Sequence, residues 1–259
     1  MSKSVIPIIL VSPELSHVFR ILNPNAYANH IRADVMACAD KMALVTHSVL
    51  LVQQAIERDL GNFLSDLTDE SKYGYAFKGF VPDPQKPALA VYRSIGFQVG
   101  LQSFFITTKS MLDIYARVIC KSIVPQSTIF GFNEGTWRGR KIVGGRLLNW
   151  IERSSPATYT KKEELISILD AHIHDWIAGA VECRDDIVHE GHVPGLIDMC
   201  VSLLNKPQDI TRAEIILPAI KDKGNVLEYC QKIQMGINRF LKETIVLLPD
   251  VDVRLVALQ

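Results

Sequence analysis

The sequence has no excess of charge of either sign, because its 28 lysine and arginine residues match its 28 aspartate and glutamate residues. Proteins that coat nucleic acid or an anionic membrane surface are usually basic overall. Any contact of this chain with nucleic acid must therefore be confined to a local patch of its surface.

The sequence also lacks a long hydrophobic run. Its longest stretches without a charged residue, 42–56 and 94–108, are shorter than the roughly 18 apolar residues that cross a bilayer, and both contain Gln, Ser and Thr. The first residues are apolar only briefly and show no small-residue cleavage pattern of a signal peptide. We expect a cytoplasmic protein with no membrane partner.

Cysteine is scarce, and the common nucleotide and hydrolase motifs are missing. The five cysteines are scattered and form no C-x-x-C pair, which predicts buried, reduced thiols. Neither the phosphate-binding pattern G-x-x-x-x-G-K-[S/T] nor the nucleophile pattern G-x-S-x-G occurs. The sequence indicates no cofactor, and no motif supports an enzyme that acts on a small molecule.

The histidine pairs are poorly placed to bind a metal. His172 and His174 are two residues apart and would point in different directions from a helix. Gly191 separates His189 from His192 and would end the helix between them. No third ligand is evident, so we expect no metal site.

What the sequence does have is a large apolar share, 48%, arranged in helical patterns. Apolar residues recur every three or four positions, which is typical of helices with one buried face. The spacing predicts long helices over 26–67, 88–124, 160–191 and 225–247, and a short helix over 142–152.

The segments between these helices differ in character. Prolines and glycines mark a loop over 65–87, residues 125–155 are glycine-rich and irregular around the short helix, and alternating apolar residues over 196–220 predict a small β-hairpin. The predicted fold class is mainly α, an antiparallel helical bundle with a long N-terminal helix and a β-hairpin insertion. We divide the chain into a helical extension with its loop, 1–87, and the bundle, 88–259.

Local signals refine two of the helices. Thr160 and Glu163 form a capping-box pattern at the start of the third long helix, and Gly191 suits the left-handed conformation that ends helices. Gly96 and Gly100 lie one turn apart in the second long helix, where they should let another helix pack closely.

The densest group of ionisable residues lies at the end of the third long helix, in the segment 182–192. Arg184 continues the apolar stripe of that helix, and an arginine near the core needs an acidic partner or a ligand. Asp185 and His189 are four residues apart, so the carboxylate could orient the imidazole and raise its basicity. Arg184 and His189 are five apart, about 140° around an ideal helix, which favours a site completed by a second copy of the helix.

The pattern Arg184-Asp185-x-x-x-His189, late in a helix of a helical protein, resembles the R-x4–6-H motif of HEPN domains. In that family the residue after the arginine is commonly Asn, Asp or His, and Asp185 agrees with this. The order of elements over residues 88–248 is also similar, whereas the first 87 residues match no family pattern.

The resemblance implies a metal-independent endoribonuclease that acts as a homodimer, with one cleft formed by two motif helices across a two-fold axis. His189 would act as general base or acid, and Arg184 would hold the scissile phosphate of the RNA substrate. Asp185 would orient His189 or contact the substrate. The products would carry 2′,3′-cyclic phosphates, and a neutralising partner protein, as in toxin–antitoxin pairs, would suit such an activity.

A basic patch offers a site for the same substrate. It comprises Arg138, Arg140, Lys141 and Arg146, followed by Arg153, and is interleaved with Trp137 and Trp150. Basic and aromatic residues on a glycine-rich segment would suit single-stranded RNA. The simpler alternative is a solvated loop whose tryptophans anchor it to the core. Asp113, in the second long helix, either faces the motif or is merely exposed.

Two functional interpretations stay open. The first is the endoribonuclease. The second is a non-catalytic, HEPN-like module for dimerisation or for binding a nucleotide or partner protein. In the second, Arg184 pairs with Glu182, Asp185 or Asp186 of a neighbouring helix, and His189 caps the end of its own helix. Net neutrality suits the binding module slightly better than the ribonuclease.

Overall fold

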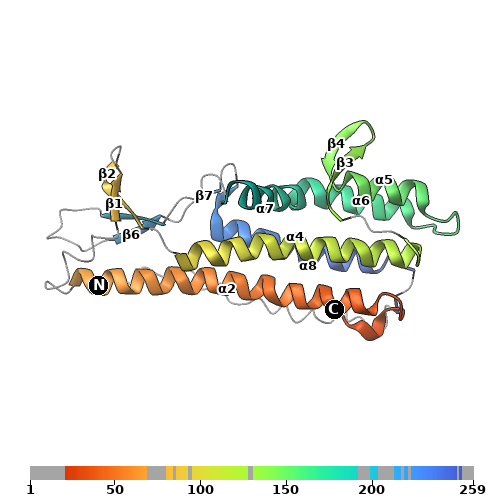
Figure 1. Cartoon of the computed structure of the whole chain (residues 1–259), viewed down its shortest axis with the longest axis horizontal. Coiled ribbons are helices and arrows are strands. Elements are labelled where there is room, and N and C mark those ends of the chain that lie inside the picture. The colour runs from red at the N-terminus through yellow and green to blue at the C-terminus, as the bar shows by residue number, and fades with distance from the viewer. Residues whose placement is uncertain are drawn as a thin grey trace. The chain divides into compact units, whose positions relative to one another are not determined.

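A computed structural model describes residues 21–68, 80–83, 86–92, 95–127, 131–191, 199–203, 213–216, 219–220, 223–249 and 251–252. These residues are mainly helical, as the sequence predicts, and they also include short antiparallel strands (Figure 1). Contacts between residues divide the chain into two compact units, each assembled from segments that are distant in sequence. The first unit contains Ser48–Gln102 and Asp186–Cys230, and the second contains Ser103–Asp185 with segments that end at His47 and begin at Gln231.

A four-stranded antiparallel sheet lies in the first unit. Its strands, in spatial order, are β1 (Phe80–Asp83), β2 (Lys86–Tyr92), β5 (Met199–Leu203) and β6 (Ala213–Ile216). Cys200 of β5 is opposite Ile216 of β6, which confirms the hairpin predicted over 196–220. A smaller ladder joins β7 (Ala219–Ile220) to β8 (Gly224–Asn225).

The start predicted for the second long helix is wrong. Residues 88–92 belong to β2, which pairs with both β1 and β5, and helix α4 (Ile95–Ile123) begins after the strand. A short apolar run fits a strand as well as a helix, and β5 is far away in sequence, so local spacing could not reveal the pairing. The segment predicted as a loop before it also contains β1.

In the first unit, helix α2 (Arg32–Thr68) packs closely on α4. A Cβ added to Gly100 would lie 2.9 Å from Cγ2 of Val52 and 3.0 Å from the Val52 backbone nitrogen. One turn earlier, a Cβ on Gly96 would lie 3.3 Å from that of Ala55. The two glycines therefore permit the close helix contact that their spacing predicts.

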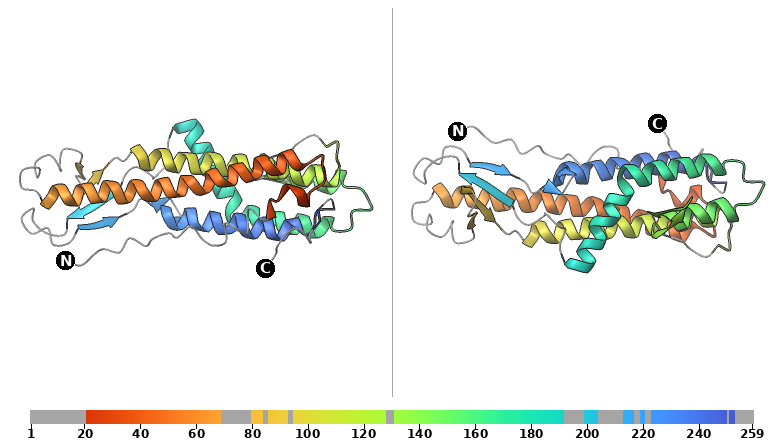
Figure 2. Two further views of the ribbon diagram at one scale, coloured as in Figure 1. Left: turned by 90° about the horizontal axis from the view of Figure 1, so that it is seen from below. Right: turned by 90° about the horizontal axis from the view of Figure 1, so that it is seen from above.

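The helices of the second unit run beside one another (Figure 2). Their shared core contains buried aromatic residues. The helices are parts of α2 and α4, α5 (Gly145–Ser154), α6 (Lys162–His172), the π-helical turn η3 (Ile173–Ile177), the first part of α7 (Ala178–Glu190) and most of α8 (Val226–Ile245). Lys121 on α4 binds Asp34 on α2 at 2.6 Å, and Tyr115 on α4 shares a hydrogen bond of 2.8 Å with Thr244 on α8. The Tyr115 ring also packs edge to face on Phe240 in the core.

Helix α6 does not begin with the predicted capping box. Lys161 occupies the N-cap position without a side-chain cap, and Lys162 is the first helical residue. Glu163 is therefore one position too early for the box, and its carboxylate lies 3.6 Å from Nζ of Lys162 instead. The predicted end is confirmed, because Gly191 has a φ of 77° and its amide donates to the Ile187 carbonyl at 3.0 Å.

The glycine-rich segment predicted as irregular contains a second hairpin. Strand β3 (Glu134–Trp137) pairs with β4 (Arg140–Val143), and α5 follows at once. The connection is a two-residue turn in which Arg138 and Gly139 have φ values of 46° and 80°, the signs of a type I′ turn. Four-residue strands that contain glycine give little periodic signal, so the sequence conceals this hairpin.

The cysteines that the structure describes are buried with free thiols, as predicted. They are Cys38, Cys120, Cys183 and Cys230. Burial raises the pKa of the Cys38 thiol, which keeps that group protonated and unreactive.

Within the described residues, one helix is long and apolar enough to cross a membrane. It is the part of α2 between Arg32 and Arg58, and the buried core helix of a soluble protein passes the same test.

Candidate functional site

Helix α7 carries the three side chains of the predicted motif. Nη1 of Arg184 donates a hydrogen bond to Oδ1 of Asp185 at 2.7 Å, and the two side chains are 28% and 44% exposed. The arginine is thus half-buried at the edge of the apolar stripe that includes Val181. The acidic partner that such an arginine needs is the next residue of its own helix.

His189 lies one turn beyond Asp185, on the exposed surface of α7. In the part of the chain that the structure describes, its imidazole makes no hydrogen bond or ion pair. Asp185 is held by Arg184, so the carboxylate and the imidazole are not joined as their four-residue spacing predicts. The structure therefore brings Arg184 and Asp185 together and leaves His189 with both ring nitrogens available.

The backbone just after His189 is held in place. Gly191 closes the helix, and its carbonyl accepts a hydrogen bond from Nε2 of Gln102 on α4 at 3.0 Å. A carbonyl at a helix C-terminus has no partner within the helix, so this bond satisfies a group that would otherwise need water. The exposed imidazole is thus attached to a defined helix end.

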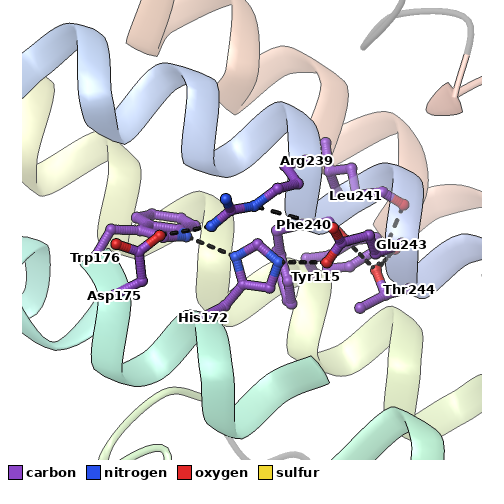
Figure 3. Close-up of polar contacts among 9 residues, drawn as sticks. All are labelled: Tyr115, His172, Asp175, Trp176, Arg239, Phe240, Leu241, Glu243 and Thr244. Atoms are coloured by element: carbon purple, nitrogen blue, oxygen red, sulfur yellow. Dashed lines mark hydrogen bonds and ion pairs between the residues drawn. The ribbon is translucent and has the colours of Figure 1, made fainter. Parts of the chain in front are cut away.

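A second polar group lies inside the contact between α6 and α8, in the second unit (Figure 3). The buried ring of His172 accepts a hydrogen bond at Nδ1 from Nε1 of Trp176 at 2.9 Å, and its Nε2 lies 2.8 Å from Oε2 of Glu243. An indole N–H can only donate, so the neutral ring carries its proton on Nε2 and donates it to the carboxylate. Burial lowers the pKa of His172, although the Glu243 carboxylate opposes that shift.

A chain of alternating charges extends from this group along α8. Nη2 of Arg239 donates to Oδ2 of Asp175 at 2.5 Å, and Nε of Arg239 lies 4.0 Å from Oε1 of Glu243. Nζ of Lys232 lies 3.1 Å from the other oxygen of Asp175. The hydrogen bonds from Lys232 and Arg239 lower the pKa of Asp175. Each carboxylate therefore has a cation beside it.

The indole of Trp176 is enclosed by α8. A Cβ added to Gly236 would lie 2.8 Å from both Cδ1 and Nε1 of the ring, so this contact requires glycine on α8. Trp176 belongs to the π-helical turn, and single π-helical turns inside α-helices are often found at functional sites. Here both nitrogens of His172 are occupied and its ring is 2% exposed, so the group joins α6 to α8 and cannot exchange protons with a ligand.

The sequence indicates the contacts of this group within each helix, but not the contact between the two helices. The pairs His172 with Trp176 and Arg239 with Glu243 each have the four-residue spacing of neighbours on a helix. Nothing in that spacing indicates that the two pairs face each other across the bundle. From the sequence, His172 was interpreted only as a possible metal ligand, and its structural role was not predicted.

The predicted basic patch lies on the β3–β4 hairpin and α5, in the second unit. Nζ of Lys141 pairs with Glu134 at 2.6 Å, and Nη2 of Arg138 lies 3.9 Å from Glu152. The Arg138 guanidinium also stacks over the ring of Trp137, 4.8 Å from its centroid. Further exposed cations of the patch are Arg140, Arg146 and Arg153.

Trp137 is buried, which agrees with the prediction that a tryptophan anchors this segment to the core. It is therefore not available to stack on a base. The cations around it are exposed, so the hairpin is anchored by an aromatic residue and presents its charges to solvent.

Asp113 holds a loop in place. Its two oxygens accept hydrogen bonds from the buried Nζ of Lys109, both at 2.6 Å, and one of them also accepts the Phe132 amide at 2.9 Å. The same carboxylate leaves no room for a side chain at Gly131. Asp113 thus fixes the approach to β3, a role that neither sequence interpretation included.

Among the described residues, no group of three His, Cys, Asp or Glu side chains could hold a metal ion. Comparison of the whole chain with protein-family models, with curated proteins and with solved structures finds no match.

Proposed function

We propose that this protein is a metal-independent endoribonuclease of the HEPN type, which acts in the cytoplasm as a homodimer. The observation that carries the proposal is the end of α7, where a half-exposed guanidinium, Arg184, precedes an exposed imidazole, His189, that has no partner among the described residues. An imidazole and a guanidinium can together cleave RNA through its own 2′-hydroxyl, and the reaction needs no cofactor.

In this mechanism His189 acts as the general base. It takes the proton of a ribose 2′-hydroxyl, and the oxygen attacks the adjacent phosphorus. The bond from phosphorus to the 5′-oxygen breaks, and the partner's His189 supplies the proton that this oxygen needs to leave. The products are a 2′,3′-cyclic phosphate and a 5′-hydroxyl, and DNA cannot react because it lacks the 2′-hydroxyl.

Arg184 stabilises the charge that develops on the phosphate oxygens. A guanidinium has five N–H donors, and the hydrogen bond to Asp185 uses one of them. The remaining donors stay available for a bidentate contact with phosphate. In this proposal Asp185 positions Arg184, whereas the family resemblance implied that it would orient His189 or contact the substrate.

The dimer follows from the helical spacing of the two groups. Five residues apart on one helix, Arg184 and His189 point about 140° away from each other. Two copies of α7 about a two-fold axis would place Arg184 of one protomer beside the partner's His189. Val188, next to the imidazole, is 57% exposed and offers apolar surface for such a contact.

The test is an RNA cleavage assay with labelled single-stranded RNA in the presence of EDTA. The wild-type protein should produce 2′,3′-cyclic phosphate ends. His189→Ala and Arg184→Ala should each lower the cleavage rate by about 10²-fold or more, because each removes a group that acts in the transition state. A matched control is His174→Ala, which removes another exposed imidazole of the same helical segment and should leave the rate unchanged.

A cellular assay tests the same proposal. An endoribonuclease that is active in the cytoplasm should arrest growth when overexpressed unless a neutralising partner protein accompanies it. Arg184→Ala should relieve the arrest, and His174→Ala should not. Growth arrest that persists in the Arg184→Ala variant would contradict a role for this arginine in RNA cleavage.

One observation favours the second candidate, a non-catalytic module for dimerisation or partner binding. Arg184 is already neutralised by Asp185, as expected for an arginine with a purely structural role. In this case the purified protein should form dimers and leave RNA intact. A stable dimer without activity towards unstructured and hairpin RNAs would replace the first proposal with the second.

A further inference from the structure

The hairpin β3–β4 and helix α5 concentrate positive charge in a protein that is neutral overall. Their residues, 134–154, include five arginines and lysines and only two carboxylates, Glu134 and Glu152. The five cations are Arg138, Arg140, Lys141, Arg146 and Arg153, which we call the basic hairpin surface. A local excess of this kind is what a neutral chain needs if it is to contact a polyanion.

Three of these cations have no acidic partner in the part of the chain that the structure describes. The two carboxylates of the segment lie beside Lys141 and Arg138, at 2.6 and 3.9 Å. Arg140, Arg146 and Arg153 are exposed and make no ion pair with any residue that the structure describes. Each of these guanidinium groups is therefore available to an anion from solution.

The frame beneath these side chains is rigid. A Cβ on Gly145 would collide with the carbonyl oxygen of Gly135, so α5 and β3 are in direct backbone contact. Trp137 anchors the end of β3 in the core. Cations on such a frame keep their spacing, and a preorganised surface binds a ligand with a smaller loss of conformational entropy than a flexible loop does.

Arg138 occupies a backbone position that suits arginine poorly. Its φ of 46° is in the left-handed region, where asparagine and glycine are favoured in the first position of a type I′ turn. Asparagine would fit this backbone conformation better, whereas the contacts of the guanidinium are stacking on Trp137 and a long ion pair with Glu152. An unfavourable conformation at an exposed, charged side chain is an observation that points from structure to function.

We propose that the basic hairpin surface binds the phosphate backbone of single-stranded RNA. The choice of RNA among polyanions rests on the proposed ribonuclease function, for which this surface would hold the substrate. Trp137 is buried and cannot stack on a base, so binding depends on charge and has little sequence preference. Arginine suits this role because its planar N–H groups match phosphate oxygens in pairs.

Binding can be measured without cleavage by fluorescence anisotropy with a 2′-O-methyl oligoribonucleotide, which lacks the reactive hydroxyl. Each phosphate contact contributes about 0.7 to the slope of log K against log salt for a single strand. Replacing both Arg140 and Arg146 with Gln should therefore reduce that slope by about 1.4 and weaken binding about 10- to 30-fold at 0.1 M salt.

The matched control removes two lysines elsewhere in the second unit. Lys41 and Lys242 are partly exposed and make no ion pair with the described residues, so Lys41→Gln with Lys242→Gln changes net charge equally. This variant should bind nearly as well as the wild type. Equal losses in the two double variants would overturn the proposal, because net charge and not the hairpin would then account for binding.

A gain of affinity provides an independent test. Glu134→Gln with Glu152→Gln frees Lys141 and Arg138 from their carboxylates and should tighten binding several-fold, with a steeper salt dependence. Circular dichroism of each variant verifies that the fold is retained. Unchanged affinity in this variant would contradict a phosphate contact at the hairpin.

The outcomes separate this inference from the ribonuclease proposal. If the wild type binds the oligoribonucleotide through Arg140 and Arg146 but cleaves no RNA, RNA binding by the basic hairpin surface is supported and the catalytic role of α7 is contradicted. If RNA is cleaved and the hairpin substitutions leave kcat/KM unchanged, the catalytic role of α7 is supported and RNA binding by the basic hairpin surface is contradicted. Absence of RNA binding, or hairpin-dependent binding only to phosphatidylserine vesicles, would overturn the inference.

Discussion

Two histidines of the α6–α7 segment have opposite surroundings. His172 is buried, and both of its ring nitrogens are engaged, one by the Trp176 indole and the other by the Glu243 carboxylate. His189 is exposed and makes no hydrogen bond within the described part of the chain. A ring of the first kind stabilises helix packing and is closed to substrate. A ring of the second kind adds little to stability and keeps both nitrogens for chemistry.

The largest effect should come from removing the indole that holds His172. Trp176 is 1% exposed, so Trp176→Ala should lower the free energy of unfolding by about 3–5 kcal/mol, as for other buried tryptophans. Trp176→Phe keeps most of the volume and removes the N–H donor, so its loss should be clearly smaller. Urea unfolding measures both, and equal losses in the two variants would contradict the importance of volume at this position.

The two histidines themselves allow a direct test. His172→Gln can still donate to Glu243 but leaves the Trp176 N–H without its acceptor, which should cost about 1–3 kcal/mol of unfolding free energy. His189→Gln should change stability by no more than about 0.5 kcal/mol, because no bond is lost. For RNA cleavage the order should reverse, with the folded His172→Gln variant active and His189→Gln inactive. A large stability loss in His189→Gln would show that this histidine is structural.

The pH dependence of stability should also come from His172. Burial lowers its pKa in the folded protein below the ordinary value of 6.5, so well above pH 6.5 the ring is neutral in both folded and unfolded chains. As the pH falls below 6.5, the unfolded chain binds a proton that the folded chain does not, and stability decreases. Charges facing the ring from α8 and η3 are those of Glu243, Arg239 and Asp175.

Urea unfolding at pH 7.5, 6.5 and 5.5 measures this effect. The pKa of Asp175 is lowered from 3.8, so its protonation enters only in stronger acid and does not disturb this range. The wild type should lose stability between pH 6.5 and 5.5, and His172→Gln should lose less. An identical pH profile in the two proteins would contradict a lowered pKa at His172.

Helices were predictable from the sequence, and strands only in part. The apolar spacing identified α2, α4, α6–α7 and α8 because one buried face imposes a regular pattern on a long helix. The apolar spacing did not predict strands β2 and β3. These strands have only four to seven residues, and they pair with segments that local spacing does not identify. The capping pattern predicted Thr160 as the N-cap of α6, whereas the N-cap in the structure is Lys161, one residue later.

The candidate site was predictable in its residues but not in its bonds. The sequence identified Arg184, Asp185 and His189 as residues of one helix, and the structure has them on α7. It could not show that the carboxylate binds the adjacent arginine, because a long guanidinium side chain competes with the four-residue neighbour for the same oxygen. The hydrogen bond between His172 and Glu243 was not predicted for a related reason. The two helical pairs that contain these residues meet only in the tertiary fold.

Arg138 extends the comparison of the two histidines to a charged side chain and should give the smallest change in stability. Arg138→Asn removes the stacking on Trp137 and a long, exposed ion pair, but places a residue suited to φ near 46° in the turn. The opposing terms should cancel to within about 0.5 kcal/mol in urea unfolding. RNA binding should nevertheless weaken about fivefold at 0.1 M salt, as expected for one lost phosphate contact. A marked loss of stability without a change in affinity would place Arg138 with His172, among the groups that hold the fold together.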